Sequence, residues 1–529
     1  DDEARFFTTQ ERQSLVLHLL HTLRAGPQDL HSLPGLKMVE GQAIIPKCIS
    51  AGIISQVFPL HELPALEKLQ RTWVRAFLSP QPLDDICKYF GVKITMYFAW
   101  LGHYTTALIV PAAVGAIYWV KNQAVEDVAY VLFSVFNVIW ATVYLETWKR
   151  RGAELAYRWG TLDQRDDLLV EPRPLFTGTL ETSPVTGRLE PTYPRWKRNM
   201  FRYFVSVPII AACLFFVFIV MILSFQIQVR QLDLVTSSCS YTLPLFLLFH
   251  YLVISFILES SHVTVDSICD FCVLDAENYR LDTEYENHLI YKVALFQFVN
   301  SFLSLFYIAF YLQDQERLKE QLAALLIARQ VIGNLKESAV PYLIEQLRLA
   351  RLSFELFVTL RSRFGLDLGR RVELRAESGA NYDGAFSEHL EMLSQLGYVC
   401  LFSSAFPLAA MAALLGNLLE LRGDAFKLCF VLQRPFGRRV SNIGTWQNAM
   451  EAMGLVAILV NCALIGLSGQ VQRMFPEMSA TQTILLIVAL EHIMLGIRFI
   501  IICAIPDIPH WVATEMAKVE FLRREAVRR

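Results

Sequence analysis

Residues 392–421 read MLSQLGYVCLFSSAFPLAAMAALLGNLLEL, and the way in which this apolar stretch meets the membrane decides the fold. If it crossed once, the basic segment after it and the basic C-terminus would both lie outside the cytoplasm, against the positive-inside rule. Pro407 offers a helix break near the middle of the stretch. A turn there returns both basic segments to the cytoplasmic side. We therefore predict a hairpin of two short arms, covered by protein or water where they do not span. The basic segment carries Arg422, Lys427, Arg434, Arg438 and Arg439.

The composition around this stretch is that of an integral membrane protein. Of the 529 residues, 54% are hydrophobic and 19% are charged, whereas a soluble domain has about 25% charged residues. Apolar runs of about bilayer length occur at 92–119, 126–147, 202–225, 241–258, 289–312, 321–342, 443–467 and 481–506. Together with the two arms of the hairpin, they predict an all-α polytopic membrane protein with ten membrane helices per subunit.

The distribution of Lys and Arg orients these helices. The loop after the second predicted span is strongly basic, so we expect this loop and both chain termini to lie in the cytoplasm. Its basic residues are Lys149, Arg150, Arg151, Arg158, Arg165, Arg173, Arg188, Arg195, Lys197 and Arg198.

The chain is expected to have three parts. They are a small cytoplasmic α/β domain at 1–90, a transmembrane domain at 91–507 and a cytoplasmic amphipathic helix at 508–529. Within the first part, apolar patterning predicts short strands at 43–45 and 52–58 and a helix at 63–77.

Several function classes find no support in the sequence. The net charge of −2 gives no argument for a nucleic-acid partner. There is no P-loop, G-x-S-x-G, H-E-x-x-H or G-x-G-x-x-G motif, so we do not expect an enzyme. Cys269 and Cys272 form a lone C-x-x-C pair. Because a zinc site needs four ligands, a metal or redox role and a plain packing role both remain open for this pair.

Five acidic residues lie near the ends of predicted membrane helices. Glu388 and Glu391 are three residues apart on the first arm and share one helix face. Glu420 and Asp424 are four apart on the second arm and also share a face. Along one straight helix, Glu391 and Glu420 would be about 44 Å apart, whereas the hairpin brings them to similar depth. The fifth acid, Glu337, lies near the end of the preceding span.

Acids at membrane depth need compensation, because each costs about 2.5–3.5 kcal/mol on insertion scales. Basic partners look too few, since Arg422 and Lys336 are wrongly spaced to face Glu420 and Glu337. His389 lies between two of the acids but points off their face. A divalent cation would neutralise the acids, and an all-oxygen ligand set favours Ca²⁺ or Mg²⁺ over zinc. The alternative is that these acids are simply hydrated at the cytoplasmic helix ends.

Polar residues inside other spans suggest a hydrophilic path. Ser255 and Glu259 lie on the fourth span, and Asn300 and Ser304 lie on the fifth. Such residues also occur as ordinary contacts between packed membrane helices. Glu259 is the strongest of the four signals, because a buried charge is expensive.

Six short stretches carry a resemblance to a known family. They are 146–151 (ETWKRR), 157–160 (YRWG), 171–174 (EPRP), 286–290 (ENHLI), 442–446 (NIGTW) and 505–509 (IPDIP). In the residues and the order of these stretches, the chain resembles the anoctamins, a transmembrane family of Ca²⁺-activated chloride channels and phospholipid scramblases. The similarity runs from about residue 40 to 520 and is greatest to the intracellular branch of the family.

The resemblance implies a Ca²⁺ site built by the sixth, seventh and eighth membrane helices. The matching positions are Glu337, Glu388, Glu391, Glu420 and Asp424. Four residues before the first of these, where the family commonly has Asn, this chain has Gly333. A second family site pairs an acid that ends the second helix with one that ends the tenth, and it matches Glu146 and Asp507.

The resemblance also implies a homodimer in which each subunit has a membrane-facing groove bounded by helices three to seven. Phospholipid head groups or anions would move along this groove, past Ser255, Glu259, Asn300, Ser304 and Lys336. In the family, Ca²⁺ draws the sixth helix toward the seventh and eighth.

Three functions are compatible with the sequence. The first is a Ca²⁺-regulated phospholipid scramblase in the endoplasmic reticulum or plasma membrane. The second is a non-transporting tether between these membranes, in which the basic C-terminal helix contacts anionic lipid. The third is a Ca²⁺-activated chloride channel, for which Lys336 is the evident pore cation. We rank the three in this order.

Overall fold

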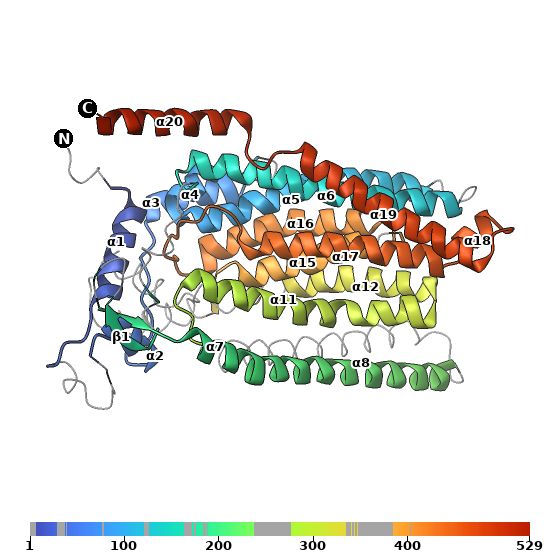
Figure 1. Cartoon of the computed structure of the whole chain (residues 1–529), viewed down its shortest axis with the longest axis horizontal. Helices are drawn as coiled ribbons and strands as arrows, with labels where there is room; N and C mark the ends of the chain where they lie inside the picture. Colours follow the sequence, from blue (N-terminus) through green and yellow to red (C-terminus); the bar gives the residue numbers. More distant parts are fainter. Residues whose placement is uncertain are drawn as a thin grey trace, which may run out of the picture. The chain divides into compact units, whose positions relative to one another are not determined.

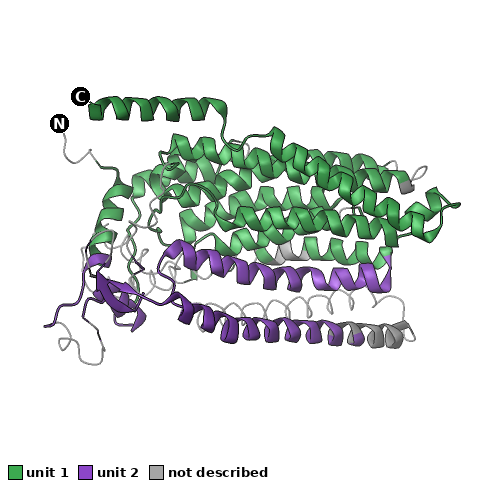
Figure 2. Cartoon of the chain, viewed as in Figure 1, with its two compact units in different colours: residues 1–20, 54–164, 315–529 green, residues 21–53, 165–314 purple. Residues whose placement is uncertain are grey.

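The computed structural model describes most of the chain, in two compact units (Figure 2). The described residues are 7–28, 40–76, 79–120, 126–162, 176–182, 189–236, 277–334, 384–402 and 404–528, with a few isolated positions between them. Unit 1 comprises 1–20, 54–164 and 315–529, and unit 2 comprises 21–53 and 165–314.

Unit 1 is a bundle of helices that run side by side along its length (Figure 1). Its long helices are α5 (Val92–Val120), α6 (Glu126–Arg158), α12 (Gln315–Asn334), α15 (Phe386–Leu401), α16 (Ala409–Phe426), α17 (Thr445–Leu467), α19 (Ala480–Ala504) and α20 (His510–Arg528). Its shorter elements are α1 (Thr9–Thr22, whose last turn reaches unit 2), α3 (Leu63–Leu69), α4 (Leu83–Phe90), α18 (Gln470–Met474) and the π-helical turns η3 (Gln70–Val74) and η8 (Lys427–Val431).

The predicted hairpin is confirmed. Helix α15 ends at Leu401, helix α16 begins at Ala409, and Pro407 lies in the turn between them. The turn packs on α5 at Gly115, where an added Cβ atom would lie 2.1 Å from the Pro407 carbonyl oxygen. Only a glycine allows α5 and this turn to approach so closely. Along its length, α5 packs against α16.

An aromatic core lies beside the hairpin in unit 1. The His389 ring of α15 stacks between Trp100 of α5 and Trp446 of α17, with ring centroids 5.2 Å apart on each side. The His389 Nδ1 atom lies 2.6 Å from the Ala385 carbonyl oxygen. The prediction that His389 points off the acidic face of its helix is therefore confirmed.

The N-terminal segment of unit 1 packs on the chain that follows the hairpin. Arg434 is buried, donates to the Tyr89 carbonyl oxygen at 2.9 Å and lies over the Tyr89 ring. Arg422 donates to the carbonyl oxygens of Trp73 and Ser79. Both segments therefore lie at the same end of the bundle, as the predicted hairpin requires. That this end faces the cytoplasm stays a prediction.

Among its described residues, unit 2 contains α2 (Ile44–Ser50), a β-hairpin and two longer helical segments. The strands are β1 (Thr179–Thr182) and β2 (Leu189–Thr192), and the described helices form two continuous long segments: α7 (Arg195–Phe201), η4 (Arg202–Ser206) and α8 (Val207–Thr236) in the first, and α11 (Asp282–Phe306) and η6 (Tyr307–Leu312) in the second. The antiparallel strands pair Thr179 with Thr192 and Thr182 with Leu189. This β-hairpin falls in the loop that the sequence identified only as basic.

The strands predicted near the N-terminus are wrong. Residues 44–50 form helix α2, in which Pro46 occupies the first turn, where a missing N–H costs no hydrogen bond. Ala43 makes only an isolated bridge with Arg24. Residues 52–58 form turns and irregular chain, beginning at Gly52 with a φ of +75°. The helix predicted at 63–77 is present as α3 and η3, and it ends at Val74.

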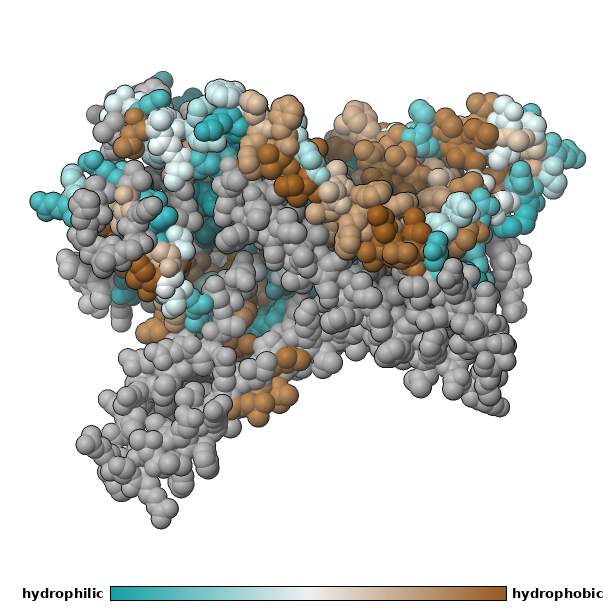
Figure 3. Space-filling view, turned by 90° about the horizontal axis from the view of Figure 1, so that it is seen from below, coloured by the Kyte–Doolittle hydropathy of each residue, from teal (hydrophilic) through white to brown (hydrophobic). Residues whose placement is uncertain are grey.

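Six helical segments of the described chain are long and apolar enough to cross a membrane. They are Val92–Val120, Val128–Arg158, Arg195–Leu223, Asp282–Leu312, Thr445–Leu467 and Ala480–Ala504. Three more of the predicted membrane helices are present as helices of the described chain: the two hairpin arms, α15 and α16, and α12, which overlaps the span predicted at 321–342. The predicted span 241–258 lies outside the described residues, so the total of ten stays a prediction. On the face shown in Figure 3, hydrophobic residues gather in contiguous areas and hydrophilic residues gather toward the ends.

A buried ionic network links α11 of unit 2 to the chain before it. Glu277, which is fully buried, accepts hydrogen bonds from Ser206, from Tyr279 and from Lys292, whose Nζ atom lies 2.6 Å away. Burial alone would raise the pKa of Glu277, but these three hydrogen bonds together lower it below its usual value. Glu277 is therefore a carboxylate at neutral pH.

The approach at Gly115 gives the first prediction. Gly115→Ala should destabilise the protein by about 1–3 kcal/mol, because the new Cβ atom overlaps the backbone of the hairpin turn. Gly496→Ala in α19 is the matched control, since no atom lies within 4 Å of its added Cβ. It should be neutral, or stabilising by about 0.5–1 kcal/mol. Thermal unfolding in detergent compares the two, and equal effects would contradict the packing.

The second prediction concerns pH. Because the pKa of Glu277 is lower in the folded state than its usual value of 4.5, its ionisation stabilises the fold above that pH, and the stabilisation is lost as the pH falls through the lowered pKa. Glu277→Gln should therefore be less stable than the parent at pH 7, and the difference should shrink below about pH 4.5. Unfolding temperatures from pH 3 to 7 test this. A difference independent of pH would contradict it.

Candidate functional site

The hairpin brings the predicted acids of its two arms to one end of unit 1. Glu388 lies in the first turn of α15, and Asp424 lies in the last turn of α16. Lys427, directly after α16, is within ion-pair distance of both. Asp424 and Glu420 are buried, each 3% exposed. Glu388 and Glu391 are partly buried.

Helix α12 approaches the same cluster. A Cβ atom added to Gly333 would lie 3.5 Å from Oε1 of Glu391, so the α12 backbone lies close to this carboxylate. This agrees with a site shared by the three helices α12, α15 and α16. Glu337 and Lys336 lie outside the described residues, so the contribution of the sixth-helix acid stays a prediction.

The structure adds a cation that the sequence argument missed. The Lys427 Nζ atom lies 2.8 Å from Asp424 Oδ1 and 3.4 Å from Glu388 Oε1. Lys427 is 7% exposed. Since it follows Asp424 by three residues and Glu420 by seven, it lies on their helix face, and this spacing could have identified it. The expectation that basic partners are too few is therefore wrong for Asp424 and Glu388.

Two further polar residues complete this part of the site. Tyr97 of α5, which is buried, donates from its hydroxyl to Asp424 Oδ2 at 2.6 Å. Asn417 of α16 is fully buried, and neither polar atom of its amide has a hydrogen-bond partner among the residues that the structure describes. Asn417 precedes Glu420 by three residues and therefore shares its face. The tyrosine and the amide were not identified from the sequence.

The chemistry of this cluster fits a hard divalent cation, although its present geometry does not enclose one. The donors are four carboxylates and an amide, the oxygen ligands that Ca²⁺ prefers. The unsatisfied buried amide of Asn417 indicates a place for one more polar partner. Among the described residues, however, no three His, Cys, Asp or Glu side chains are close enough together to hold a metal ion.

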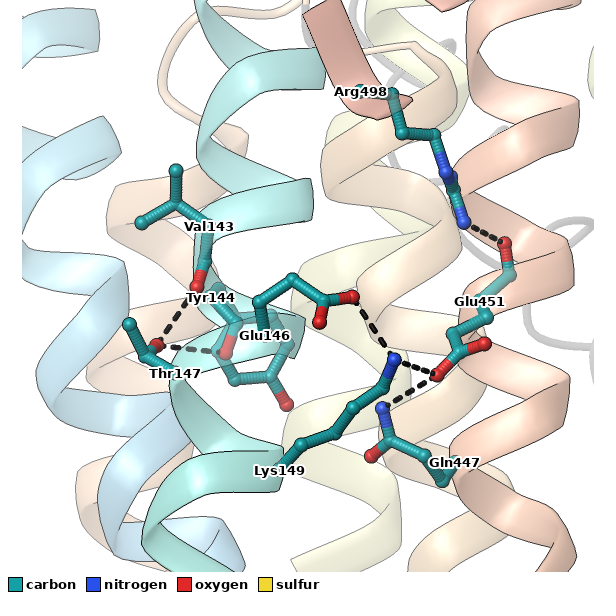
Figure 4. Close-up of polar contacts among 8 residues, drawn as sticks. All are labelled: Val143, Tyr144, Glu146, Thr147, Lys149, Gln447, Glu451 and Arg498. Carbon is teal, nitrogen blue, oxygen red and sulfur yellow. Dashed lines mark hydrogen bonds and ion pairs between the residues drawn. The ribbon is translucent and has the colours of Figure 1, made fainter. Parts of the chain in front are cut away.

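The second predicted metal pair, Glu146 with Asp507, stays a prediction. Glu146 of α6 is buried, whereas Asp507 is exposed beyond the end of α19. Lys149 bridges Glu146 to Glu451 of α17, with its Nζ atom 3.0 Å and 2.9 Å from their Oε1 atoms (Figure 4). No hydrogen bond or ion pair of the described chain joins Glu146 to Asp507. The acid that meets Glu146 across a helix interface is Glu451, which the sequence argument did not include.

Arg498 of α19 also contacts this second cluster, which consists of Glu146, Lys149 and Glu451. Its Nη2 atom donates to the Glu451 carbonyl oxygen at 2.9 Å, and Gln447 donates to the Glu451 carboxylate at 3.1 Å (Figure 4). Gly454 makes room for the guanidinium, since an added Cβ atom would lie 2.7 Å from Nη1. The cluster ties α6, α17 and α19 together.

Of the polar residues predicted along the groove, the structure describes only Asn300 and Ser304. Asn300 on α11 is buried, and its Oδ1 atom has no hydrogen-bond partner. Ser304, one turn further, is partly buried. Ser255, Glu259 and the C-x-x-C pair at Cys269 and Cys272 lie outside the described residues.

Unit 1 has the structure of a polytopic membrane protein, a bundle of membrane-length helices with buried carboxylates on a helical hairpin. A family model described as "Anoctamin: Calcium-activated chloride channel" matches residues 86–519. The chain therefore belongs to the anoctamin family.

Curated relatives agree with this assignment. The chain is 37% identical to mouse Anoctamin-8, with all of the chain and 69% of the relative covered. It is 41% identical to mouse Anoctamin-10, with all of the chain and 80% of the relative covered. Rat Anoctamin-7 is 26% identical over 88% of the chain and 63% of the relative. The Anoctamin-8 alignment spans 738 positions and the Anoctamin-10 alignment spans 532.

The bridge at Lys149 gives the third prediction. Lys149→Met leaves two acids facing each other across α6 and α17. Because the bridge is only partly buried, its loss should cost less than the roughly 3–5 kcal/mol of a fully buried pair and more than the roughly 1 kcal/mol of an exposed one. Adding Glu146→Gln should recover part of the loss.

Thermal unfolding in detergent measures these effects. The control is Lys518→Met, which removes an exposed lysine paired with Glu515 on α20. If Lys149→Met costs no more than Lys518→Met, the bridge does not hold the two helices together.

Proposed function

We propose that this protein is a Ca²⁺-regulated phospholipid scramblase. The observation that carries the proposal is the hairpin of α15 and α16, which gathers four carboxylates next to α12. Membership of the anoctamin family supports the same function.

The residues that would hold the ion are Glu388, Glu391, Glu420 and Asp424. When bound, Ca²⁺ supplies the positive charge that lets these carboxylates lie close together. The Tyr97 hydroxyl holds Asp424 in place by donating a hydrogen bond to one carboxylate oxygen. The other oxygen pairs with Lys427, which also pairs with Glu388. Without sufficient counter-charge the acids repel one another and α12 is released from the hairpin, a local charge change with a wider structural effect.

Lipid movement is favoured over chloride conduction by the described side chains of α11. Its polar membrane-depth residues include the neutral Asn300 and Ser304. Its single Lys or Arg is Lys292, which is already paired with Glu277. A neutral polar path suits zwitterionic head groups, whereas an anion path needs cationic side chains.

The tether and the chloride channel are the alternatives. For a tether, the basic C-terminal helix α20 would bind anionic lipid through residues such as Arg523 and Arg528. However, Lys518 and Arg524 are already paired with acids of the same helix, Glu515 and Glu520. This pairing favours an ordinary solvated helix. A homodimer in the endoplasmic reticulum or plasma membrane, with both termini cytoplasmic, belongs to the same proposal.

The fourth prediction tests the transport activity. In proteoliposomes, Ca²⁺ should stimulate fluorescent-lipid scrambling by the parent protein. Glu391→Gln with Glu420→Gln should raise the Ca²⁺ needed for half-maximal stimulation by more than about tenfold, since even outer-shell changes at metal sites typically cost about 10–100-fold.

The matched control is Glu477→Gln with Glu515→Gln, two acids far from the hairpin in sequence; Glu477 is exposed, and the Glu515 side chain is 42% exposed. It should scramble like the parent. No scrambling by folded, dimeric parent protein would exclude the scramblase and place the tether first. Chloride flux without lipid movement would favour the channel.

A further inference from the structure

The ammonium group of Lys427 pairs with one acid on each arm of the hairpin. Its Nζ atom touches Asp424 on α16 and Glu388 on α15, at 2.8 Å and 3.4 Å. The Lys427 side chain is 9% exposed, which lies between the 4% of Asp424 and the 12% of Glu388. Lys427 is therefore buried within the carboxylate cluster and is not exposed to solvent.

The surroundings hold Asp424 from both sides. Tyr97 donates to Oδ2 and Lys427 pairs with Oδ1. Oδ2 is therefore hydrogen-bonded, whereas Oδ1 is held by the ion pair alone and has no hydrogen-bond partner in the described chain. A divalent cation that used Oδ1 would have to take it from the ammonium group.

The lysine side chain is suited to such an exchange. It is a point charge on a flexible four-carbon stem, so it can leave a carboxylate without displacing the helix. Its single charge cannot neutralise the four carboxylates of the hairpin, whereas a divalent cation brings twice the charge to the same oxygens. Two cations that require the same oxygens oppose each other, and the coupling is reciprocal.

We propose that Lys427 is a built-in cation that occupies the carboxylate cluster and competes with Ca²⁺ for Glu388 and Asp424. It keeps the two arms together when no ion is bound, and it raises the Ca²⁺ concentration at which the site fills. This inference rests on the proposed function, because it assumes that the cluster is the Ca²⁺ site.

The size of the effect follows from the fraction of time the site is open. If the lysine leaves the acids free for one tenth to one hundredth of the time, the apparent dissociation constant rises by about 10- to 100-fold. This range is similar to the roughly 5–150-fold of typical coupled sites.

The fifth prediction is an equilibrium binding experiment on the full chain in detergent. Isothermal titration with Ca²⁺ compares the parent with Lys427→Met, which keeps the apolar stem and removes the charge. The variant should bind Ca²⁺ about 10- to 100-fold more tightly. Lys427→Arg, which keeps a cation, should stay close to the parent. Lys518→Met, which removes an exposed lysine of α20, should match the parent.

A second readout covers the case in which Lys427→Met is poorly folded. Lys427→Gln is then used, and its unfolding temperature is measured with and without Ca²⁺. Without the ion the variant should melt below the parent. With saturating Ca²⁺ its rise in melting temperature should exceed that of the parent, because tighter binding gives more stabilisation at the same ion concentration.

The outcomes separate the two proposals. Equal or weaker Ca²⁺ binding by both neutral variants overturns the role of Lys427, while the cluster remains the Ca²⁺ site if Glu391→Gln with Glu420→Gln abolishes binding. Binding by the neutral variants but not by the parent supports the role in its strongest form. No binding by any protein overturns both proposals.

Discussion

Buried charge has to be balanced, and in the described chain lysine side chains do this at three places. In each, the ammonium group lies within hydrogen-bond or ion-pair distance of a carboxylate that is nearly inaccessible to solvent. At two of them the same lysine also reaches an acid on a neighbouring helix, so charge balance and helix packing depend on the same contacts. The three are Lys292 with Glu277, Lys149 with Glu146 and Glu451, and Lys427 with Asp424 and Glu388.

The hairpin shows how this constraint connects to function. The turn at Pro407 is held against Gly115 of α5, and the open ends of its arms carry the acids. One end is therefore fixed by close packing, while the other is held by charges that a divalent ion can replace. Packed interfaces resist gradual deformation, whereas ion pairs exchange partners. A rigid turn with an exchangeable end suits a switch, and this geometry supports the proposed Ca²⁺ control.

Much of this arrangement could be predicted from the sequence. The hairpin was predicted from the positive charge of the segments that follow it. The shared helix faces of its four acids were predicted from their spacing. The β-hairpin of β1 and β2 was missed, and the strands expected at 43–45 and 52–58 were wrong, because short apolar runs do not distinguish a strand from a buried helix. Lys427 was missed because only immediate neighbours of the acids were considered as partners.

By itself, the sequence determined that the chain is a helical membrane protein, where it reverses and which acids share a helix face. These properties depend on hydrophobic length, charge and helical period, which are local. Only the tertiary structure decided the partners that are distant in sequence: Tyr97 for Asp424, Lys427 for Glu388, and Glu451 as the second acid of Lys149. The physical reason is that an ion pair requires contact within a few ångströms, and Tyr97 and Asp424 are 327 residues apart in the chain.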